Sequence, residues 1–321
     1  MNTRTLGRSG IDVSALGMGC WAIGGPFWRG DKPVGWGDVD DAESMRAIAR
    51  ALELGVTLFD TSDVYGCGHS ERILGEALRG RRDQVVIATK FGNVFDEQTR
   101  QITDASGDPA HIRAACDASL RRLQTDYIDL YQFHLGGYDL DKTDDVIATL
   151  EELVDAGKIR WYGWSTDDPE RAAKFAEDPH CAAIQQRLNL FEGNEETLGI
   201  CEENNLASLN RGPLAMGLLT GKFSADSTLP ANDVRAGNGW DFRSGEQARR
   251  LAALDEMRAV LTRDGRTLAQ AAIGWLLAHS NATIPIPGFK NVAQVEENAG
   301  ALAYGPLSNG QMVELATLKS S

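Results

Sequence analysis

Four residues that can take part in proton transfer stand at or just after the ends of short apolar segments. Asp60 ends the segment VTLFD, and Tyr65 follows it by five residues. Lys90 ends VVIATK, and His134 ends YIDLYQFH. A phenol held beside an ammonium can give a proton to a substrate oxygen, because the positive charge stabilises the phenolate. If the fold gathers these side chains, the set can interconvert a carbonyl and an alcohol as hydride is transferred.

The ordinary pKa values of these groups suggest separate roles. A free tyrosine hydroxyl titrates at about 10, so we expect Lys90 to lower the pKa of Tyr65 and to make the phenol a useful acid. Asp60 would pair with Lys90, which keeps the amine charged and fixes its position. His134 would orient the substrate oxygen through a hydrogen bond or share the proton. Run backwards, the same set oxidises an alcohol.

Each of these residues also has an ordinary structural explanation. Asp60 can cap the turn that follows a strand, and Tyr65 can be a packing aromatic. A single histidine after an apolar strand, such as His134, is more often a hydrogen-bonded core residue than a catalyst. The joint occurrence favours function, because all four positions fall at corresponding strand ends.

Alternating strand-like and helix-like segments must position this set. After a predicted N-terminal β-hairpin, the strand-like segments are 16–21, 56–60, 85–90, 127–134, 160–165, 182–188, 206–211 and 283–288. Helical spacing marks the intervening segments, among them 41–54, 69–79, 109–124 and 143–156. Eight such units predict an α/β fold, a (β/α)8 TIM barrel of parallel strands. Its active site forms at the C-terminal strand ends, where the four residues would converge.

The length and the longest interruption of the pattern complete this prediction. We expect residues 1–321 to form a single barrel domain with long loops on its C-terminal face, since α/β barrels commonly exceed about 250 residues as one unit. Residues 221–245 are rich in Gly, Asp, Asn and Ser. A loop of this length inside a compact domain is usually a lid or a binding loop.

Composition disfavours several classes of protein. The net charge of −14, with no stretch rich in Lys and Arg, disfavours nucleic-acid binding. No segment has the pattern of a secretory signal or a membrane span, so a cytoplasmic location is expected. Five scattered cysteines indicate free thiols, and five histidines without ligand spacing predict no metal site. The oligomeric state is not predicted.

The motifs around the four residues resemble those of the aldo-keto reductase family. DTSDVYGCGHSE, residues 60–71, is similar to the most specific signature of that family, and IATKFG and DLYQFH follow in the same order. The resemblance covers nearly the whole chain. It implies a barrel that binds a nicotinamide cofactor across its C-terminal rim without a Rossmann domain, and it implies the four catalytic roles given above.

The resemblance also implies a set of cofactor contacts. GWST, residues 163–166, looks like the G-x-S-N of the family, so Ser165 and Gln185 would hold the carboxamide while Thr166 replaces Asn. Arg211 stands where the family often has an aromatic that stacks on the nicotinamide, and a planar guanidinium can also stack. The other implied contacts are Cys20, Trp21, Asp60, Gly212, Leu214, Gly221, Lys222, Gly288, Phe289, Lys290, Gln294, Glu297 and Asn298.

The last residues of this set, from Gly288 to Asn298, bear on whether NADP or NAD binds. Lys290 could meet a 2′-phosphate, which favours NADP (NADPH). The strongly basic version of this segment that some relatives have is absent, so NAD stays possible. Expected substrate contacts are the aromatic residues Trp21, Trp28 and Tyr138, together with Tyr65 and His134.

Several functions stay open at this point. The favoured one is an NAD(P)H-dependent oxidoreductase that reduces aldehydes or ketones, with a sugar or alcohol dehydrogenase as the same relay run in the oxidative direction. A nucleotide-binding redox sensor with vestigial turnover is a second possibility. A Schiff-base lyase that uses Lys90 as nucleophile is a third, although Asp60 argues against it by keeping the amine charged. The expected partner is a small carbonyl compound or a sugar.

Overall fold

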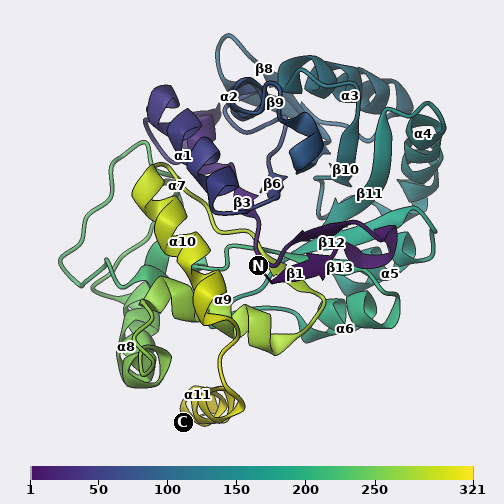
Figure 1. The fold of residues 1–321 in the computed structure, drawn as a ribbon. Coiled ribbons are helices and arrows are strands. Elements are labelled where there is room, and N and C mark those ends of the chain that lie inside the picture. Colours follow the sequence, from purple (N-terminus) through teal and green to yellow (C-terminus); the bar gives the residue numbers. More distant parts are fainter. Residues whose placement is uncertain (1, 321) are drawn as a thin grey trace.

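The computed structural model describes residues 2–320 and contains an eight-stranded parallel sheet that helices surround (Figure 1). Each strand overlaps one of the predicted strand-like segments, and β7, β11 and β12 each extend one residue beyond it. In chain order and in spatial order the strands are β3 (Met18–Gly19), β6 (Leu58–Asp60), β7 (Val86–Phe91), β10 (Ile128–Phe133), β11 (Ile159–Ser165), β12 (Cys181–Arg187), β13 (Ala207–Arg211) and β14 (Thr283–Pro285).

The first and last strands join, and the sheet therefore closes. Gly17 N donates to Pro285 O and Gly19 N donates to Pro287 O, each at 2.9 Å, and Gly19 forms a parallel bridge with Gly288. A Cβ on Gly19 would lie 2.8 Å from Ile286 O, so only glycine permits this approach. The predicted (β/α)8 barrel is confirmed.

The helices of the first four units begin where they were predicted and end one or two residues earlier. They are α1 (Asp41–Glu53), α2 (His69–Ala77), α3 (Pro109–Leu123) and α4 (Thr143–Asp155). Asp40 caps α1 by accepting a hydrogen bond from Glu43 N. Gly157, with φ +69°, follows the end of α4 as predicted.

An N-terminal hairpin closes the end of the barrel at which the strands begin. It consists of β1 (Thr3–Thr5) and β2 (Asp12–Ser14). Leu6 and Val13 are buried in one cluster with residues of the barrel interior such as Leu58 and Leu209. At the hairpin turn, a Cβ on Gly7 would lie 2.2 Å from Ala182 O. This turn packs against the entry to β12, so the opposite rim is left for a site.

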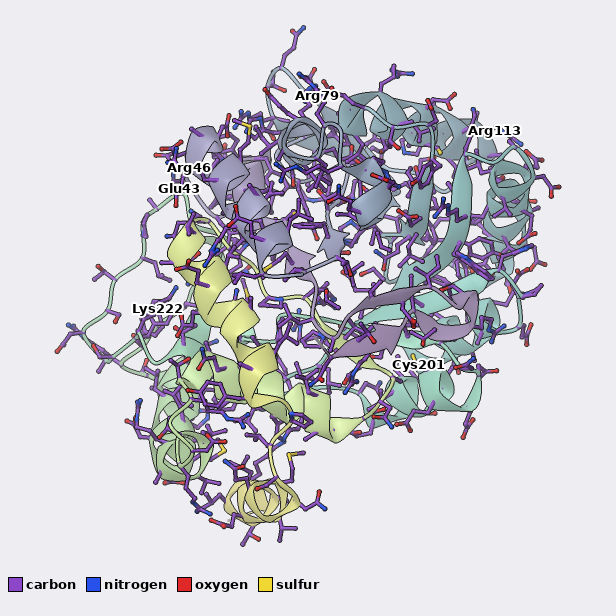
Figure 2. The ribbon with its side chains drawn as sticks, in the orientation of Figure 1. Glu43, Arg46, Arg79, Arg113, Cys201 and Lys222 are labelled. Carbon is purple, nitrogen blue, oxygen red and sulfur yellow. The ribbon has the colours of Figure 1, made fainter. Side chains whose placement is uncertain are left out.

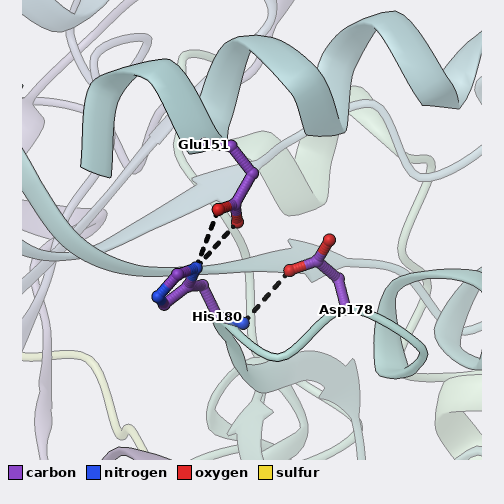
Figure 3. Close-up of side chains that lie close together, drawn as sticks. All are labelled: Glu151, Asp178 and His180. Carbon is purple, nitrogen blue, oxygen red and sulfur yellow. Dashed lines mark hydrogen bonds and ion pairs between the residues drawn. The ribbon is translucent and has the colours of Figure 1, made fainter. Parts of the chain in front are cut away.

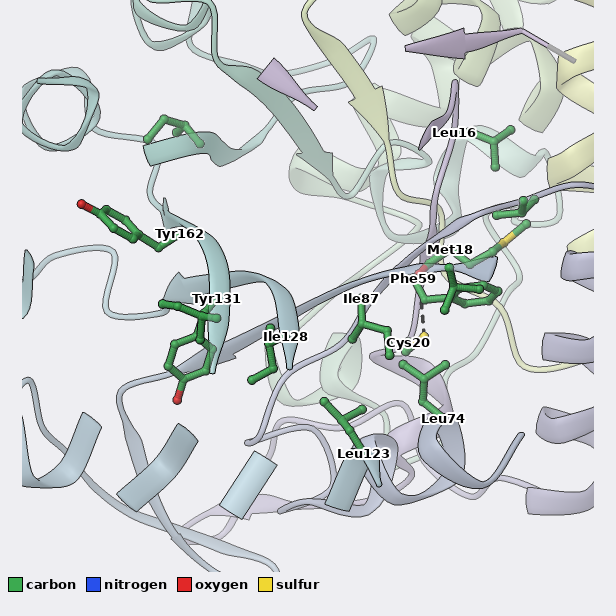
Figure 4. Packing of buried hydrophobic residues seen from close by; sticks show 14 of the residues in the cluster. Leu16, Met18, Cys20, Phe59, Leu74, Ile87, Leu123, Ile128, Tyr131 and Tyr162 are labelled. Atoms are coloured by element: carbon green, nitrogen blue, oxygen red, sulfur yellow. Dashed lines mark hydrogen bonds between the residues drawn. The ribbon is translucent and has the colours of Figure 1, made fainter. Parts of the chain in front are cut away.

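A second apolar layer lies between the sheet and the outer helices (Figure 4). There Phe59 and Ile87 of the sheet are packed in the same fully buried cluster as Leu74 of α2 and Leu123 of α3. Many charged side chains lie outside this layer, whereas the buried Glu71 of α2 accepts a hydrogen bond from Thr89 of β7 at 2.6 Å. In Figure 2, for example, Arg113 lies on the periphery, and its side chain is paired with Glu152 of α4. Such exposed pairs add little stability, so apolar burial holds the helices on the barrel.

The structure departs from the prediction in two loops on the C-terminal face. The first is a small second sheet that the sequence pattern did not suggest, made of β4 (Trp28–Arg29), β5 (Lys32–Pro33), β8 (Asn93–Asp96) and β9 (Gln101–Ala105). The second is the predicted loop 221–245, which contains the short helix α7 (Val234–Gly237). The remaining helices are α5 (Pro169–Ala176), α6 (Glu195–Glu203), α8 (Gly245–Leu261), α9 (Leu268–His279), α10 (Val292–Tyr304) and α11 (Asn309–Ser320).

From residue 2 to residue 320, no helix combines the length and the apolar character that crossing a bilayer requires. The five cysteines are buried free thiols, as predicted.

Candidate active site

The four predicted relay residues meet at the C-terminal rim, and Lys90 is at their centre. Lys90 Nζ donates to Asp60 Oδ2 at 2.7 Å and to Tyr65 Oη at 3.3 Å. Its third hydrogen bond goes to Thr61 O at 2.7 Å. The rings of Tyr65 and His134 lie edge to face with their centroids 6.0 Å apart. The convergence predicted from the strand ends is therefore confirmed.

Strand register brings these residues together. Asp60 pairs with Ala88 across β6 and β7, and Lys90 lies two residues further along, on the same face. Beyond the strands, Asp63 N donates to Lys90 O at 3.3 Å and His134 N donates to Phe91 O at 2.8 Å, which extends the ladder into the loops. The backbone thus holds the loop with Tyr65 close to Lys90.

A tight crossing of two loops fixes the position of Tyr65. The next residue, Gly66, has φ +61°, and a Cβ there would lie 1.9 Å from Gly24 O. We expect Gly66→Ala to lower stability by clearly more than the roughly 1–2 kcal/mol of a left-handed alanine and to reduce turnover, because Tyr65 must move. Gly80→Ala is the matched control, since Gly80 has φ +75° but open space around it. Urea unfolding and steady-state rates measure both, and equal losses in the two variants would contradict the crossing.

The charges of the site differ from the expectation in one respect. Burial alone would lower the pKa of Lys90, but Asp60 and Tyr65 offset this and leave that pKa raised. Burial also raises the pKa of Tyr65, and the opposing effect of Lys90 is smaller. The expected lowering of the Tyr65 pKa is therefore wrong. The phenol keeps its proton at neutral pH, as a proton donor must.

Two glutamines that were not predicted to act on the relay hold the other oxygen of Asp60. Gln185 Nε2 of β12 donates to Asp60 Oδ1 at 2.7 Å, and Gln132 Nε2 of β10 donates to the same oxygen at 3.2 Å. Gln185 Nε2 also lies 3.2 Å from Gln132 Oε1. Gln132 precedes His134 by two residues in DLYQFH, so strand alternation was the signal for this inward position.

Aromatic side chains line the side of Tyr65 that faces the first strand. Trp21 stacks on Tyr65 with centroids 5.9 Å apart and an interplanar angle of 22°. Trp36 packs edge-on against Trp21 at 5.3 Å. Trp21 Nε1 donates to Val34 O at 3.1 Å, which fixes the ring. The structure thus brings the predicted substrate contact Trp21 to the relay.

The other two predicted substrate contacts lie away from the relay hydroxyl. Trp28 is half-buried in the small second sheet, where it pairs with Pro33 and Gln101. Tyr138 packs edge-on against Phe133, with centroids 5.0 Å apart. No hydrogen bond or ring contact joins either residue to Tyr65 in the part of the chain that the structure describes, so their substrate role stays a prediction.

The predicted carboxamide contacts lie beside the relay at the ends of β11, β12 and β13. A cavity of about 660 Å³ opens there, lined by Ser165, Thr166 and Arg211 among others. Arg211 is ion-paired with Asp167. Thr166 Oγ1 already donates to Gly136 O at 3.1 Å, so its hydroxyl proton is engaged and does not replace the amide donor that an Asn would supply.

A group of three cations lies at the base of the long loop, and one of them was not predicted. Figure 2 labels Lys222, the first of them. Desolvation and the charge of Arg235 lower the pKa of Lys222, and both also lower the pKa of Lys290. Arg235 donates to Asp233 Oδ2 at 2.6 Å, the one ion pair that this group forms within residues 2–320. Arg235 has no local sequence signal, since it lies inside a stretch that reads as loop.

These cations also connect the loop to the rest of the rim. Lys290 Nζ donates to Trp36 O at 2.6 Å and to Asp38 O at 3.1 Å. The guanidinium of Arg235 lies 4.8 Å from the ring centroid of Trp36. Val234 N donates to Gly35 O at 2.8 Å. The segment 221–245 therefore reaches across to the loop after β3.

The remaining predicted cofactor contacts are placed unequally. Cys20 is fully buried between sheet and helices, and its N donates to Asp60 O at 2.7 Å, so its cofactor contact stays a prediction. Phe289 is likewise packed in the core. Gln294 Oε1 accepts from Lys290 N at 2.7 Å. The others lie after β13, around the cation group or after β14, with Asn298 buried and Leu214, Gly221 and Glu297 half-buried. Gly212, with φ +63°, directly follows β13, and Gly288 forms the bridge with Gly19.

One group of possible metal ligands lies on α4 and just before the start of β12 (Figure 3). Donor atoms of Glu151, Asp178 and His180 all lie within 4.8 Å of one another, the one such set among residues 2–320. His180 Nδ1 pairs with Glu151 Oε2 at 2.8 Å, and Tyr162 Oη donates to Glu151 Oε1 at 2.6 Å. Hydrogen bonds of Glu151 with His180 and Tyr162, and of Asp178 Oδ1 with the backbone N of His180, account for this cluster.

Comparison with known proteins identifies relatives along nearly the whole chain. Residues 15–319 match the model of the aldo/keto reductase family. The aldo-keto reductase YhdN of Bacillus subtilis is 35% identical over 301 residues, which cover 92% of this chain and 87% of that protein.

Solved structures give the same result. A glycerol dehydrogenase from Gluconobacter oxydans superposes with a TM-score of 0.85 at 33% identity, covering 98% of this chain and 94% of that one. An aldo-keto reductase from Klebsiella pneumoniae in complex with NADPH superposes with a TM-score of 0.73 at 27% identity, covering 99% and 96%.

Proposed function

Because the chain belongs to the aldo-keto reductase family, we propose that it is an NADP(H)-dependent oxidoreductase that reduces aldehydes or ketones to alcohols. The observation that carries this proposal is the position of Lys90 Nζ, 2.7 Å from Asp60 and 3.3 Å from the hydroxyl of Tyr65. A carbonyl needs a proton at oxygen when hydride reaches carbon, and Tyr65 is the group that keeps one at neutral pH.

The roles of the residues follow from their contacts. A bound nicotinamide would supply the hydride. Tyr65 gives its proton to the substrate oxygen, and the ammonium of Lys90 stabilises the phenolate that is left. Asp60 keeps Lys90 charged and in place. His134 directs the substrate oxygen toward Tyr65, and Trp21 forms one wall beside it.

The cation group is well suited to a dinucleotide phosphate. Lys222, Arg235 and Lys290 carry three positive charges against the single ion-paired carboxylate of Asp233. The amine of Lys290 is bonded only to backbone carbonyls among the residues described. Asp38 and Glu297 also act on these lysines, but the amines of Lys222 and Lys290 form no ion pair among the residues described. These two unpaired amines support NADP over NAD, since the 2′-phosphate adds negative charge.

Charge removal in this group should weaken cofactor binding. We expect Lys290→Met and Lys222→Met each to reduce NADPH affinity by about 10- to 100-fold, as for loss of one hydrogen bond to a charged group. Where the replaced lysine is the one that contacts the 2′-phosphate, the affinity for NADH should stay nearly unchanged. Fluorescence titration measures both affinities, with Lys142→Met as the control because Lys142 is an exposed surface lysine. If both variants bound NADPH and NADH as tightly as wild type, the cation group would not be part of the cofactor site.

A specific observation favours oxidation of a polyol or sugar as a second function. The cavity at the ends of β11 and β13 is lined by the carboxylates of Asp167, Asp168, Glu170 and Glu196, with Arg211 as its one cation. Asp167 is ion-paired with Arg211 and Asp168 with Arg171, which leaves Glu170 and Glu196 as acceptors. Hydroxyl groups can donate to carboxylates, whereas an anionic substrate would be repelled. The similarity to a glycerol dehydrogenase agrees with this possibility.

A substrate panel tests the proposal. We expect wild-type protein to oxidise NADPH with aldehydes or ketones, or to reduce NADP with polyols or sugars. Tight NADPH binding without turnover on either panel would indicate a nucleotide sensor instead. A Schiff-base lyase is disfavoured, because Lys90 is buried and donates to three acceptors, Asp60, Thr61 and Tyr65.

A further inference from the structure

A chain of hydrogen bonds through Ser62 and Asp63 reaches His134 at Nδ1. Ser62 Oγ lies 3.2 Å from His134 Nδ1 and donates to Asp63 Oδ1 at 3.1 Å. Val64 N also donates to Ser62 Oγ, at 3.4 Å. Ser62 and Asp63 are 0% and 1% exposed, so bulk water does not compete for these bonds. The relay described above makes no use of this chain.

The state of His134 gives the chain a possible role. Burial, together with the charges of Lys90 and Arg211, lowers the pKa of His134 well below its usual range. The imidazole is therefore neutral and carries one proton, on either Nδ1 or Nε2. The partner of Nδ1 decides which nitrogen carries it. Nε2, which Ser62 does not contact, is left for the substrate.

We propose that Ser62 and Asp63 are positioning residues that set the tautomer of His134, so that the protonation of Asp63 decides whether Nε2 offers the substrate oxygen a proton or a lone pair. This inference rests on the proposed function, because it concerns the same substrate oxygen. Neither residue touches the substrate.

The two states differ by one proton. When Asp63 is protonated, its O–H donates to Ser62, the hydroxyl of Ser62 donates to Nδ1, and the imidazole proton is on Nε2. When Asp63 is ionised, its proton has moved to the hydroxyl of Ser62, and the hydroxyl proton of Ser62 has moved to Nδ1. The proton on Nε2 has been released to solvent. Each O–H and N–H bond that breaks along the chain is replaced by a new one at the neighbouring atom.

The surroundings of Asp63 place this change in an accessible pH range. Burial and the charge of Glu71 of α2 raise the pKa of Asp63 to about 8, against the lowering effects of Arg122 of α3 and Ser62. Asp63 in turn raises the pKa values of Tyr131 on β10 and of Cys67 in the following loop. The carboxyl of Asp63 is protonated below its pKa. The Nε2–H state of His134 is therefore present below about pH 8 and is lost above it.

The consequence for catalysis is the loss of one hydrogen-bond donor. An Nε2–H stabilises the negative charge that develops on the substrate oxygen, and losing one such donor typically costs about 10²-fold in rate. The effect applies to reduction and oxidation alike, since both share one transition state. We therefore expect kcat/KM to fall above about pH 8, separately from the titration of Tyr65, whose pKa is raised above its ordinary value.

The pH profiles of variants at Ser62 and Asp63 test this inference. Asp63→Asn cannot ionise, and its amide can donate to Ser62 as the protonated acid does, so the fall above about pH 8 should disappear. Ser62→Ala should lower kcat/KM and also lose this fall, and Ser62→Thr should restore it through its hydroxyl. Asp144→Asn is the control, since its side chain is 80% exposed on α4 and its profile should match that of wild type. An Asp63→Asn profile that superposes on wild type would overturn the inference.

The tautomer itself can be read without turnover. With ¹⁵N-labelled histidine, the ring nitrogen shifts of His134, assigned by comparison with His134→Gln, should change from the Nε2–H to the Nδ1–H pattern as pH rises through about 8. In Asp63→Asn the Nε2–H pattern should persist, and unchanged signals of the other histidines would show that the variant is folded. Should it not fold, Ser62→Ala must show a His134 tautomer that no longer follows pH.

The two kinds of measurement separate this inference from the proposed function. A wild-type tautomer that stays the same from low to high pH sinks the inference, even when carbonyl reduction is found. Absence of turnover on every panel sinks the proposed function, while the nitrogen shifts still decide the role of Ser62 and Asp63.

Discussion

Tyr65→Phe should lower kcat/KM for carbonyl reduction by about 10²- to 10⁴-fold, the usual contribution of a positioned general acid. The substitution removes only the hydroxyl that lies 3.3 Å from Lys90 Nζ. The ring that stacks on Trp21 at 5.9 Å is kept, so the wall of the site should survive. Steady-state kinetics with NADPH and the best carbonyl of the panel measure the loss.

The matched measurement is cofactor affinity in the same variant. Because the cation group of Lys222, Arg235 and Lys290 does not involve Tyr65, NADPH should bind as tightly as to wild type. A variant that turns over at a near-normal rate would show that another group supplies the proton. One that loses cofactor binding instead would show that the ring, and not the hydroxyl, matters.

Lys90→Met should abolish turnover and also destabilise the fold by about 3–5 kcal/mol, the range found when one partner of a buried ion pair is removed. Lys90 is 0% exposed and Asp60 is 2% exposed, so the substitution leaves a buried carboxylate without its cation. The donors of Gln132 and Gln185 remain on Asp60 Oδ1 but do not neutralise its charge. Urea unfolding at neutral pH measures the loss.

A second substitution separates the two effects. Asp60→Asn in the Lys90→Met background removes the unpaired charge, so stability should recover much of the loss while turnover stays absent. The four proteins form a double-mutant cycle, which measures the coupling between Lys90 and Asp60 directly. A Lys90→Met protein as stable as wild type, or a double variant no more stable than Lys90→Met, would contradict a charged buried pair.

The sequence predicted the barrel well because its signals are local and repeated. Short apolar segments followed by helical spacing recur eight times, and parallel strands need such crossovers. The small second sheet was missed, because its strands, such as β4 with only Trp28 and Arg29, are too short to show alternation. Strand bounds also differed from the predicted segments for a local reason. Apolar residues such as Leu16 and Trp21 continue past the hydrogen-bonded ladder of β3.

By its own order and spacing, the chain determined that Asp60, Lys90 and His134 end neighbouring strands and therefore share a rim. Only the tertiary structure decided the distances between segments and the degree of burial of each side chain. Gln132 and Gln185 meet at Asp60 from strands that are far apart in sequence. Burial outweighs Lys90 in setting the pKa of Tyr65, and desolvation is a property of packing that no local pattern encodes.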